Sequence, residues 1–348
     1  MIAYWLLIGL PTLLSFLAIP AGKPRRALLW LVALVYQVFV GLRYQVGADR
    51  VAYGYMHQYI AAVPLSQALA FTEPGYAALN WGVARLGGNM DWVNFAVSLV
   101  FVSGLVRLAS LLPNPWIALV SVTPYLVIAI GMSAVRQSAA IGLVFHLMAS
   151  WRQGPSRKLL LSGIAASFHY SAVMAFIFVQ QSIWLRSWVR GLLLALAAAA
   201  IFPVLNSSDA YAKYYATYLE GNLLSPGAFM HVLLNAIPGI LYLLLRKRWH
   251  ARFGKNDLLP MLSVLSIASI FGVSVSSTGI DRLALYLSPI QMMVYGSLPV
   301  LFGRQYQILW CALIAGYNLV VMYWWLNYAN TAKGFLPYDN WLAHWFAD

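Results

Sequence analysis

The chain has 348 residues, of which 62% are hydrophobic and only 9% charged, and its formal net charge is +13. Its mean hydropathy of +0.73 excludes a soluble domain, and its continuous rather than alternating apolar runs exclude a β-barrel. Lysines and arginines fall in short clusters between apolar runs, so the positive charge indicates membrane topology rather than nucleic-acid binding. The expected fold class is all-α: a polytopic integral membrane protein with a single transmembrane domain, residues 1–348.

The hydropathy pattern predicts about 10 to 13 hydrophobic helical segments, some of them broken or re-entrant. In chain order the apolar runs are 2–20, 27–42, 74–86, 92–112, 116–131, 136–151, 159–185, 191–205, 228–245, 258–275, 283–301 and 306–326. The run at 74–86 has only about 13 residues, which is short for a span. The first run has no basic residue before it and Lys23, Arg25 and Arg26 after it, which favours a retained span with an outside N-terminus over a cleaved signal peptide.

Two polar loops interrupt the apolar runs, at residues 43–73 and 206–227. Apolar residues recur at helical spacing within the first loop, which predicts a short amphipathic helix over 50–60 in the membrane interface. The basic clusters at 23–26 and 246–255 belong in the cytoplasm by the positive-inside rule. Both loops, the turn at 277–282 and the C-terminal tail would then face outside.

The middle of the chain allows two topologies. If every apolar run crosses, the cluster Arg152, Arg157 and Lys158 lies outside. If 74–86 is re-entrant and 159–185 is a hairpin that breaks near His169, that cluster returns to the cytoplasm, and both Arg136 and His169 face outside. We favour the second topology, because irregular backbone at membrane depth is allowed where it lines a cavity.

Arg136 is the residue that most needs a function. It stands between long apolar runs in the stretch 131–138, and a charge near the bilayer core costs at least ~3 kcal/mol unless it has water or a partner. In the favoured topology it shares the outer face with a set of polar residues that is unusual in so apolar a chain. The set is Arg43, Asp49, Arg50, Glu73, Arg136, Gln137, His169, Asp281 and Arg282.

These side chains fit a site for a substrate that carries phosphate or sugar. An arginine fork binds pyrophosphate, and Asp, Glu or neutral His takes a proton from a hydroxyl. Structural roles compete with this interpretation. Asp49 would cap the helix at 50–60, Glu73 would cap a helix starting at Pro74, Arg43 would anchor the interface, and Arg282 would pair with Asp281. The single cysteine, Cys311, and the spacing of the histidines indicate no metal site and no cofactor.

Four sequence elements resemble those of the EpsG family, and they occur in the family's order. They are Gly41-Leu42-Arg43-Tyr44 with Val46-Gly47-Ala48-Asp49 and Tyr53; Glu73-Pro74-Gly75-Tyr76 with Leu79-Asn80; Arg136-Gln137 with Ala139-Ala140; and Ala165-Ala166-Ser167-Phe168-His169-Tyr170-Ser171-Ala172. Arg282 and Pro337-Tyr338 are weaker matches. Arg50 departs from the pattern, since a small or aromatic polar residue is more usual after the aspartate.

The resemblance implies a Wzy-type bacterial inner-membrane polymerase with a fold similar to that of GT-C glycosyltransferases. Such a glycosyltransferase joins glycan repeat units on undecaprenyl pyrophosphate at the periplasmic face, in exopolysaccharide, capsule or O-antigen synthesis. Its expected partners are the lipid-linked donor and acceptor, membrane lipid, a chain-length regulator and a flippase. The sequence leaves two alternatives open: a flippase or transporter of lipid-linked glycans, and an O-antigen ligase-type transferase.

With that substrate the candidate residues take provisional roles. Arg136, Gln137, Arg282, Arg43 and Tyr53 would bind the pyrophosphate-linked substrate. Asp49, His169 and Glu73, in that order, would compete for the role of catalytic base.

Overall fold

The structure is a computed structural model that describes residues 1–17, 19–179 and 227–345. Within these ranges the chain is all-α, as the composition predicts, and it is a multi-pass membrane protein. The predicted span at 191–205 and nearly all of the loop at 206–227 lie outside the described residues.

Four helical stretches in the described ranges are long and apolar enough to cross a membrane, or up to six if each bent helix pair is one span. The four are α2 (Lys23–Gly41), α6 (Met90–Ser110), the stretch Pro115–Ser133 and the stretch Arg304–Tyr328 that ends in α20 (Gln307–Tyr328). Shorter apolar helices accompany them: α1 (Ile2–Phe16), α9 (Val135–Ala149), the stretch Tyr170–Val179 and α16 (Leu258–Gly272).

The bent pairs explain two differences from the predicted runs. α14 (Ala228–Leu244) turns by 78° into α15 (Arg246–Phe253), so the basic cluster expected in a loop begins with a helix. The segment 277–282 is not a turn, because it lies in α17 (Ser277–Ala284), whose N-cap Ser276 accepts a hydrogen bond from the Gly279 N–H. After η5 (Leu285–Leu287) the stretch bends by 45° before α18 (Pro289–Tyr295) and α19 (Leu298–Leu301). The proline at the start of α18 cannot donate a backbone hydrogen bond, which permits this bend.

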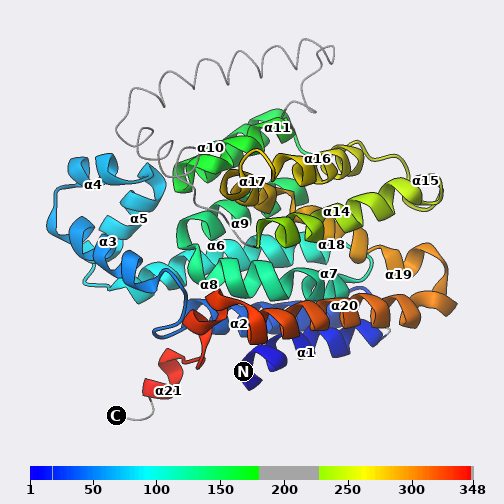
Figure 1. Ribbon diagram of the computed structural model, residues 1–348, viewed down its shortest axis with the longest axis horizontal. Coiled ribbons are helices and arrows are strands. Elements are labelled where there is room, and N and C mark those ends of the chain that lie inside the picture. The colour runs from blue at the N-terminus through cyan, green and yellow to red at the C-terminus, as the bar shows by residue number, and fades with distance from the viewer. Residues whose placement is uncertain (18, 180–226, 346–348) are drawn as a thin grey trace.

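The helices have two chemically different ends, which Figure 1 places at its left and right. At the left, α3 (Arg50–Ala62), α4 (Leu65–Phe71) and α5 (Pro74–Arg85) pack together. α3 includes the whole of the helix predicted over 50–60. The C-terminal tail joins them, since the Tyr44 N–H donates to Asp339 O at 3.0 Å. We call this the loop end. At the right lie α15 and α19, and we call this the basic end.

The described acids are distributed unequally between the two ends. The basic end carries Lys23, Arg25, Arg26, Arg107, Arg152, Arg157, Lys158 and the cluster at 246–255, and its described acid is Asp257. The other described acids lie at the loop end: Asp49, Glu73, Asp91, Asp281 and Asp339. Basic clusters gathered at one end of a set of spans are the pattern that the positive-inside rule describes.

Two segments in the middle of the chain, α5 and the stretch after α10, lie at or turn back from the loop end. α5 packs on α3 and α4 at the loop end, and α6 begins at the same end, where the Tyr76 hydroxyl contacts the Met90 sulfur. α10 (Pro155–Phe168) starts at the basic end and reaches the loop end at His169. The chain then folds back along α10 through η2 (Tyr170–Ala175) and α11 (Phe176–Val179).

A break in one span shapes the loop end. α7 (Pro115–Val122) continues as a π-helix, η1 (Thr123–Ile130), and then as α8 (Gly131–Ser133). Pro124 lacks the N–H that a regular helix would use there, which is a physical reason for the wider turn. The helix stops at Ala134, whose φ and ψ of −83° and 67° are not helical, and α9 starts at the next residue.

α6 and α9 approach each other closely at two glycines. A Cβ on Gly104 would stand 2.1 Å from the carbonyl oxygen of Gly142, and a Cβ on Gly142 would stand 2.6 Å from the Cα of Phe101. Small residues let two helices approach closely where lipid supplies no hydrophobic drive for association. This contact fixes the position of α9, and therefore of the residues at its first turn.

Gly104→Ala should destabilise the protein by about 1–3 kcal/mol, because the added methyl group overlaps the backbone of α9. The measurement is the thermal unfolding midpoint of the detergent-purified protein. Gly316→Ala is the matched control, since a Cβ at this position of α20 meets nothing within 4 Å. The control should keep or raise the midpoint, and equal midpoints for the two variants would contradict the packing argument.

Candidate active site

Arg136, in the first turn of α9, forms an ion pair with Glu73. Its Nη1 donates to Glu73 Oε2 at 2.6 Å and to the Thr72 hydroxyl at 3.1 Å, and that hydroxyl donates to the same Glu73 oxygen at 2.7 Å. The Glu73 side chain is 4% exposed and that of Arg136 is 29% exposed. The charge that looked costly in the sequence therefore has a buried partner, and Arg136 still reaches the surface.

Tyr53 on α3 lies on the other side of Arg136. Its hydroxyl lies 3.5 Å from both the backbone N and the Nε of Arg136, and its ring centre lies 5.8 Å from the guanidinium carbon. The Tyr53 ring also meets the Tyr76 ring edge-on, with centres 6.0 Å apart. α3 and α5 thus enclose the first turn of α9 from two directions.

Glu73 occupies the N-cap position of α5, but its side chain caps no backbone N–H. The capping role considered for it is therefore wrong, and its carboxylate serves Arg136 and Thr72 instead. Burial raises the pKa of Glu73, whereas the Arg136 guanidinium and the hydrogen bond from Thr72 lower it. The net pKa lies below the usual value of 4.5, so the carboxylate is ionised at neutral pH.

Asp49 shows the same departure from a cap. It precedes α3 without a side-chain capping bond, and its Oδ2 accepts from the Ser133 hydroxyl at 3.1 Å. Its own N–H donates to the same hydroxyl at 3.2 Å. Gly47 makes this approach feasible, because its φ is +124° and a Cβ there would stand 2.4 Å from Met132 O. Asp49 remains exposed, and its partner Ser133 lies three residues before Arg136, across the break at Ala134.

His169 reaches the site because α5 and α10 approach closely. A Cβ on Gly75 would stand 2.9 Å from Ser167 O, so the start of α5 lies against the end of α10. The His169 Nδ1 accepts from the Ser171 N–H at 3.3 Å and contacts the Ser171 hydroxyl at 2.7 Å. His169 also lies within electrostatic range of Glu73, Arg136 and Arg282. Because Nδ1 accepts a backbone hydrogen bond, neutral His169 carries its proton on Nε2.

Gln137 connects α9 to Arg282 on α17. Its Nε2 donates to Arg282 O at 2.8 Å, and Arg282 Nη1 donates back to its Oε1 at 3.1 Å. Gln137 is buried, so this pair fixes Arg282 beside the first turn of α9. The consecutive residues Arg136 and Gln137 therefore hold Glu73 and Arg282, which are 209 positions apart in the chain.

Arg43 lies in a different setting. Its guanidinium is buried and donates to Val40 O at 2.5 Å, Val46 O at 3.3 Å and Asn94 Oδ1 at 2.9 Å. Burial lowers the pKa of Arg43 to about 10, so it remains charged at neutral pH. The chain uses it to hold the loop after α2 against α6. Arg43 also lines a cavity of about 440 Å³, with Arg50, Tyr53, His57, Asp91 and Ser133 among the other lining residues.

A second polar cluster lies nearby, and no sequence pattern predicted it. His231 Nδ1 and Asp281 Oδ1 are 3.0 Å apart, the Tyr125 hydroxyl donates to the same Asp281 oxygen at 3.3 Å, and the Tyr125 and His231 rings stack 4.0 Å apart. His231 has no metal-ligand spacing to reveal it, and only the neighbouring Asp281–Arg282 pair marked the region. Asp281 contacts His231 on α14, whereas Arg282 contacts Gln137, so the two neighbours bind different helices.

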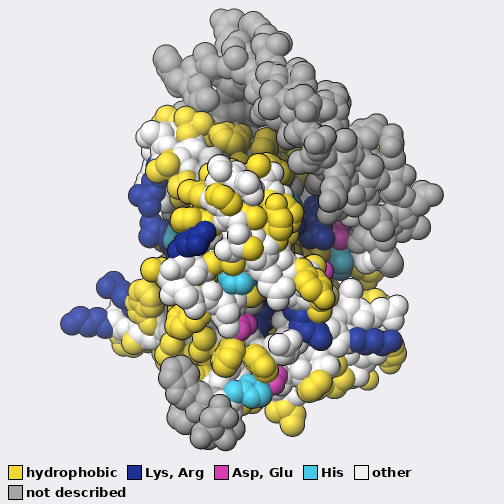
Figure 2. All heavy atoms as spheres, turned by 90° about the vertical axis from the view of Figure 1, so that its left-hand side faces the viewer, with side chains coloured by type: hydrophobic (Ala, Val, Ile, Leu, Met, Phe, Trp, Pro, Cys, Tyr) yellow, Lys and Arg dark blue, Asp and Glu magenta, His cyan; other side chains and the backbone are white. Residues whose placement is uncertain are grey.

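The loop end therefore brings together Asp49, Tyr53, Glu73, Arg136, Gln137, His169 and Arg282. Figure 2 shows this face of the molecule, with side chains of both charges and histidines interspersed among hydrophobic ones. In the described ranges no three His, Cys, Asp or Glu side chains are grouped so that they could hold a metal ion. The arrangement offers arginine donors for an anion and an exposed carboxylate close by.

Comparison with known proteins gives one match. The family model described as the EpsG family matches residues 26–340, which is nearly the whole chain. No curated protein matches, and no solved structure does. The likeness to GT-C glycosyltransferases therefore stays a prediction.

The ion pair between Arg136 and Glu73 should show strong energetic coupling. A double-mutant cycle with Glu73→Gln, Arg136→Gln and both together should give a coupling energy of about 1–3 kcal/mol in thermal unfolding, because each single change leaves a buried polar partner unsatisfied. The exposed pair Asp339 and His344 is the control, and Asp339→Asn with His344→Gln should couple more weakly. Additive effects at Glu73 and Arg136 would contradict the assigned interaction.

The same pair predicts a pH dependence. The folded-state pKa of Glu73 is lowered, so the ionised carboxylate stabilises the protein above the usual glutamate pKa of 4.5. This stabilisation is lost as the pH falls through the lower folded-state pKa. The difference in unfolding midpoint between wild type and Glu73→Gln should therefore be constant from neutral pH to about pH 5 and shrink at more acidic pH. A difference that shrinks between pH 7 and 5 would mean a raised pKa.

Proposed function

The chain belongs to the EpsG family, and from this membership we propose that it is a glycosyltransferase that joins lipid-linked oligosaccharide repeat units into a polysaccharide. Family membership and the apolar spans indicate a membrane protein of polysaccharide biosynthesis with a polymerase-type role. We further propose that the donor and the acceptor are undecaprenyl-pyrophosphate-linked glycans, in exopolysaccharide, capsule or O-antigen synthesis.

One observation supports the proposal most strongly: Arg282 is hydrogen-bonded to Gln137, the residue that follows Arg136 in the chain. Each arginine is tethered through Nη1, Arg136 to Glu73 and Thr72, and Arg282 to Gln137. In the part of the chain that the structure describes, the Nη2 groups of both have no hydrogen-bond partner. Two oriented guanidinium groups with free donors suit a pyrophosphate, whose charge increases as it leaves.

The proposed orientation places the loop end at the periplasmic face of a bacterial inner membrane. Its support is the charge difference between the ends, since cytoplasmic ends of spans carry excess Lys and Arg. The cluster of Arg152, Arg157 and Lys158 then lies in the cytoplasm, together with Lys23 and the segment 246–255. The active site faces the compartment in which lipid-linked repeat units would be polymerised.

The proposed reaction is a displacement at the anomeric carbon of the donor sugar. An acceptor hydroxyl oxygen forms the new bond to this carbon, and the bond from the carbon to the pyrophosphate oxygen breaks. The lipid pyrophosphate takes the bonding electron pair, and the hydroxyl proton goes to a base. Arg136 and Arg282 stabilise the leaving pyrophosphate, while Glu73 and Gln137 hold their side chains in place.

Asp49 is the proposed base. Its carboxylate is exposed and accepts one hydrogen bond from Ser133, which leaves lone pairs for a hydroxyl proton. Glu73 is buried and already paired with Arg136, so it serves better to position the arginine. His169 carries its neutral-state proton on Nε2, which makes it a hydrogen-bond donor to the substrate rather than a base. Tyr53 braces Arg136, and Arg43 shapes the adjacent loop.

Reconstitution with a purified lipid-linked repeat unit tests this function. Wild-type protein in liposomes should produce a ladder of glycan products. Arg136→Ala should abolish the ladder, and Asp49→Asn should reduce its rate by about 10²–10⁴-fold, because general-base catalysis contributes that much. Arg304→Gln removes a cation at the opposite end of the molecule and should leave the ladder unchanged.

The products also separate the alternatives. Movement of the lipid-linked unit across the bilayer without a ladder would favour a transporter. Transfer of a single unit to an acceptor other than the repeat unit would favour a ligase. A long polymer made by Arg136→Ala would contradict the role of the arginine.

A further inference from the structure

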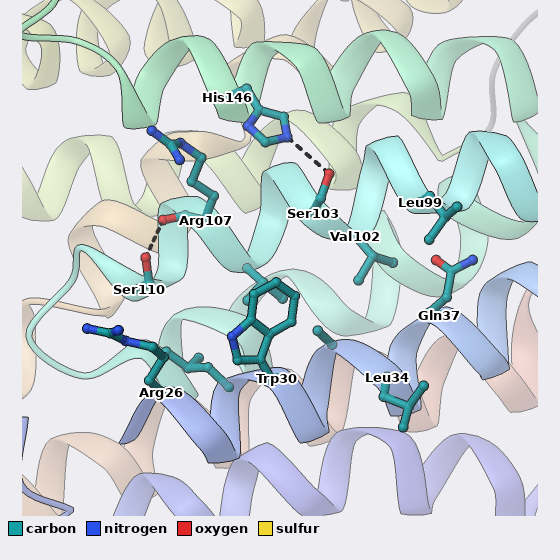
Figure 3. Close-up of a pocket in the computed structure, with 13 residues that line it drawn as sticks. Arg26, Trp30, Leu34, Gln37, Leu99, Val102, Ser103, Arg107, Ser110 and His146 are labelled. Atoms are coloured by element: carbon teal, nitrogen blue, oxygen red, sulfur yellow. Dashed lines mark hydrogen bonds between the residues drawn. The ribbon is translucent and has the colours of Figure 1, made fainter. Parts of the chain in front are cut away.

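An apolar groove lies on the outside of the helices, between α2 and α6, and one wall reaches α9 (Figure 3). Its volume is about 560 Å³. The lining side chains Trp30, Leu34 and Leu99 are 70%, 60% and 47% exposed, so the groove opens sideways from the protein. In a membrane protein a groove that opens sideways opens toward the lipid, so it faces acyl chains.

One end of the groove is basic. Arg26 on α2 and Arg107 on α6 stand on opposite walls, and Figure 3 shows their guanidinium groups at the same end. Both are exposed, and neither forms an ion pair with any residue that the structure describes. Ser110 lies beside Arg107 at this end, and farther along the groove the Ser103 hydroxyl contacts His146 at 3.0 Å (Figure 3).

The position of these arginines matches the level of lipid headgroups. Arg26 is in the first turn of α2, and Arg107 is in the last turn of α6, so both lie at the basic end of the spans. From Arg26 to Gln37, which closes the other end, the groove runs about 16 Å along α2 at ~1.5 Å per residue. This is close to half of the ~30 Å hydrocarbon core, which is one leaflet.

We propose that this groove binds an anionic phospholipid from the leaflet at the basic end. The phosphate lies between Arg26 and Arg107, and an acyl chain lies along Trp30, Leu34 and Leu99. Arginine donors complement a phosphate, and the apolar walls complement the chain. Trp30 contributes an aromatic surface close to the membrane interface, where tryptophan is favoured.

The lipid-linked donor of the proposed reaction does not fit this groove. Its pyrophosphate belongs with Arg136 and Arg282 at the loop end, whereas the groove has its cations at the opposite end. The groove also spans about one leaflet, which suits a phospholipid chain. The groove therefore binds a second ligand, whether or not the protein polymerises glycans.

The test is native mass spectrometry of the full-length, detergent-purified protein titrated with phosphatidylglycerol or phosphatidylcholine. Wild type should bind the anionic lipid at lower concentration. Arg26→Gln with Arg107→Gln should weaken binding of phosphatidylglycerol at least tenfold and abolish the preference, because each cation near the surface contributes ~1 kcal/mol. Both side chains are exposed, so the variant should keep its fold, which a thermal unfolding midpoint checks.

Two further variants separate the groove from general surface charge. Arg246→Gln with Lys247→Gln removes two cations from the same end outside the groove and should preserve the preference. Leu99→Trp fills the groove without changing its charge, and it should weaken the binding of both lipids. Equal binding of the two lipids by wild type, an unchanged preference in the Arg26 and Arg107 variant, or an equal loss in the Arg246 and Lys247 control would each overturn the proposal.

Discussion

The ion pair between Arg136 and Glu73 is the interaction on which the loop end depends. An unpaired guanidinium in the first turn of a buried helix would be costly, and an unpaired buried carboxylate would be too. Each charge is tolerable because the other is present, at 2.6 Å. The pair joins α9 to the junction of α4 and α5, and Tyr53 adds α3 to the same point. This ion pair thereby holds α3, α5 and α9 at one point, and the Gln137–Arg282 hydrogen bonds add α17.

The break at Ala134 makes this pair feasible. It ends one helical stretch and begins α9 at the loop end, so the polar residues of the first turn meet the loop helices rather than lipid. The π-helical turn before it and the glycine contact between α6 and α9 set the position of that turn. Irregular backbone inside a membrane protein is tolerated where protein or water surrounds it, and here the protein surrounds it. The break at Ala134 and the glycine contact between α6 and α9 therefore determine both the course of the helices and the position of the site.

Much of the architecture follows from pattern alone. Apolar runs predict helices, and basic clusters predict which helix ends lie together, because both depend on local composition. The α3 helix was predictable from spacing, and His169 as a break point followed from polar residues within an apolar run. The bent helices were less accessible. The sequence pattern predicted a turn at 277–282, whereas Ser276 caps a helix there. The 78° bend before α15 depends on how the surrounding helices pack.

The sequence by itself determined a helical membrane protein, its basic end and the residue types of a site, because hydropathy and charge act over short stretches of chain. Only the tertiary structure decided the partners. In the structure Asp49 and Glu73 are not caps, because Asp49 accepts a hydrogen bond from Ser133 and Glu73 forms an ion pair with Arg136. Gln137 forms hydrogen bonds with Arg282. The tertiary structure also revealed the His231 and Asp281 contact. Such pairings depend on where helices cross, and the crossings are set by contacts such as Gly104 with Gly142, which no local pattern encodes.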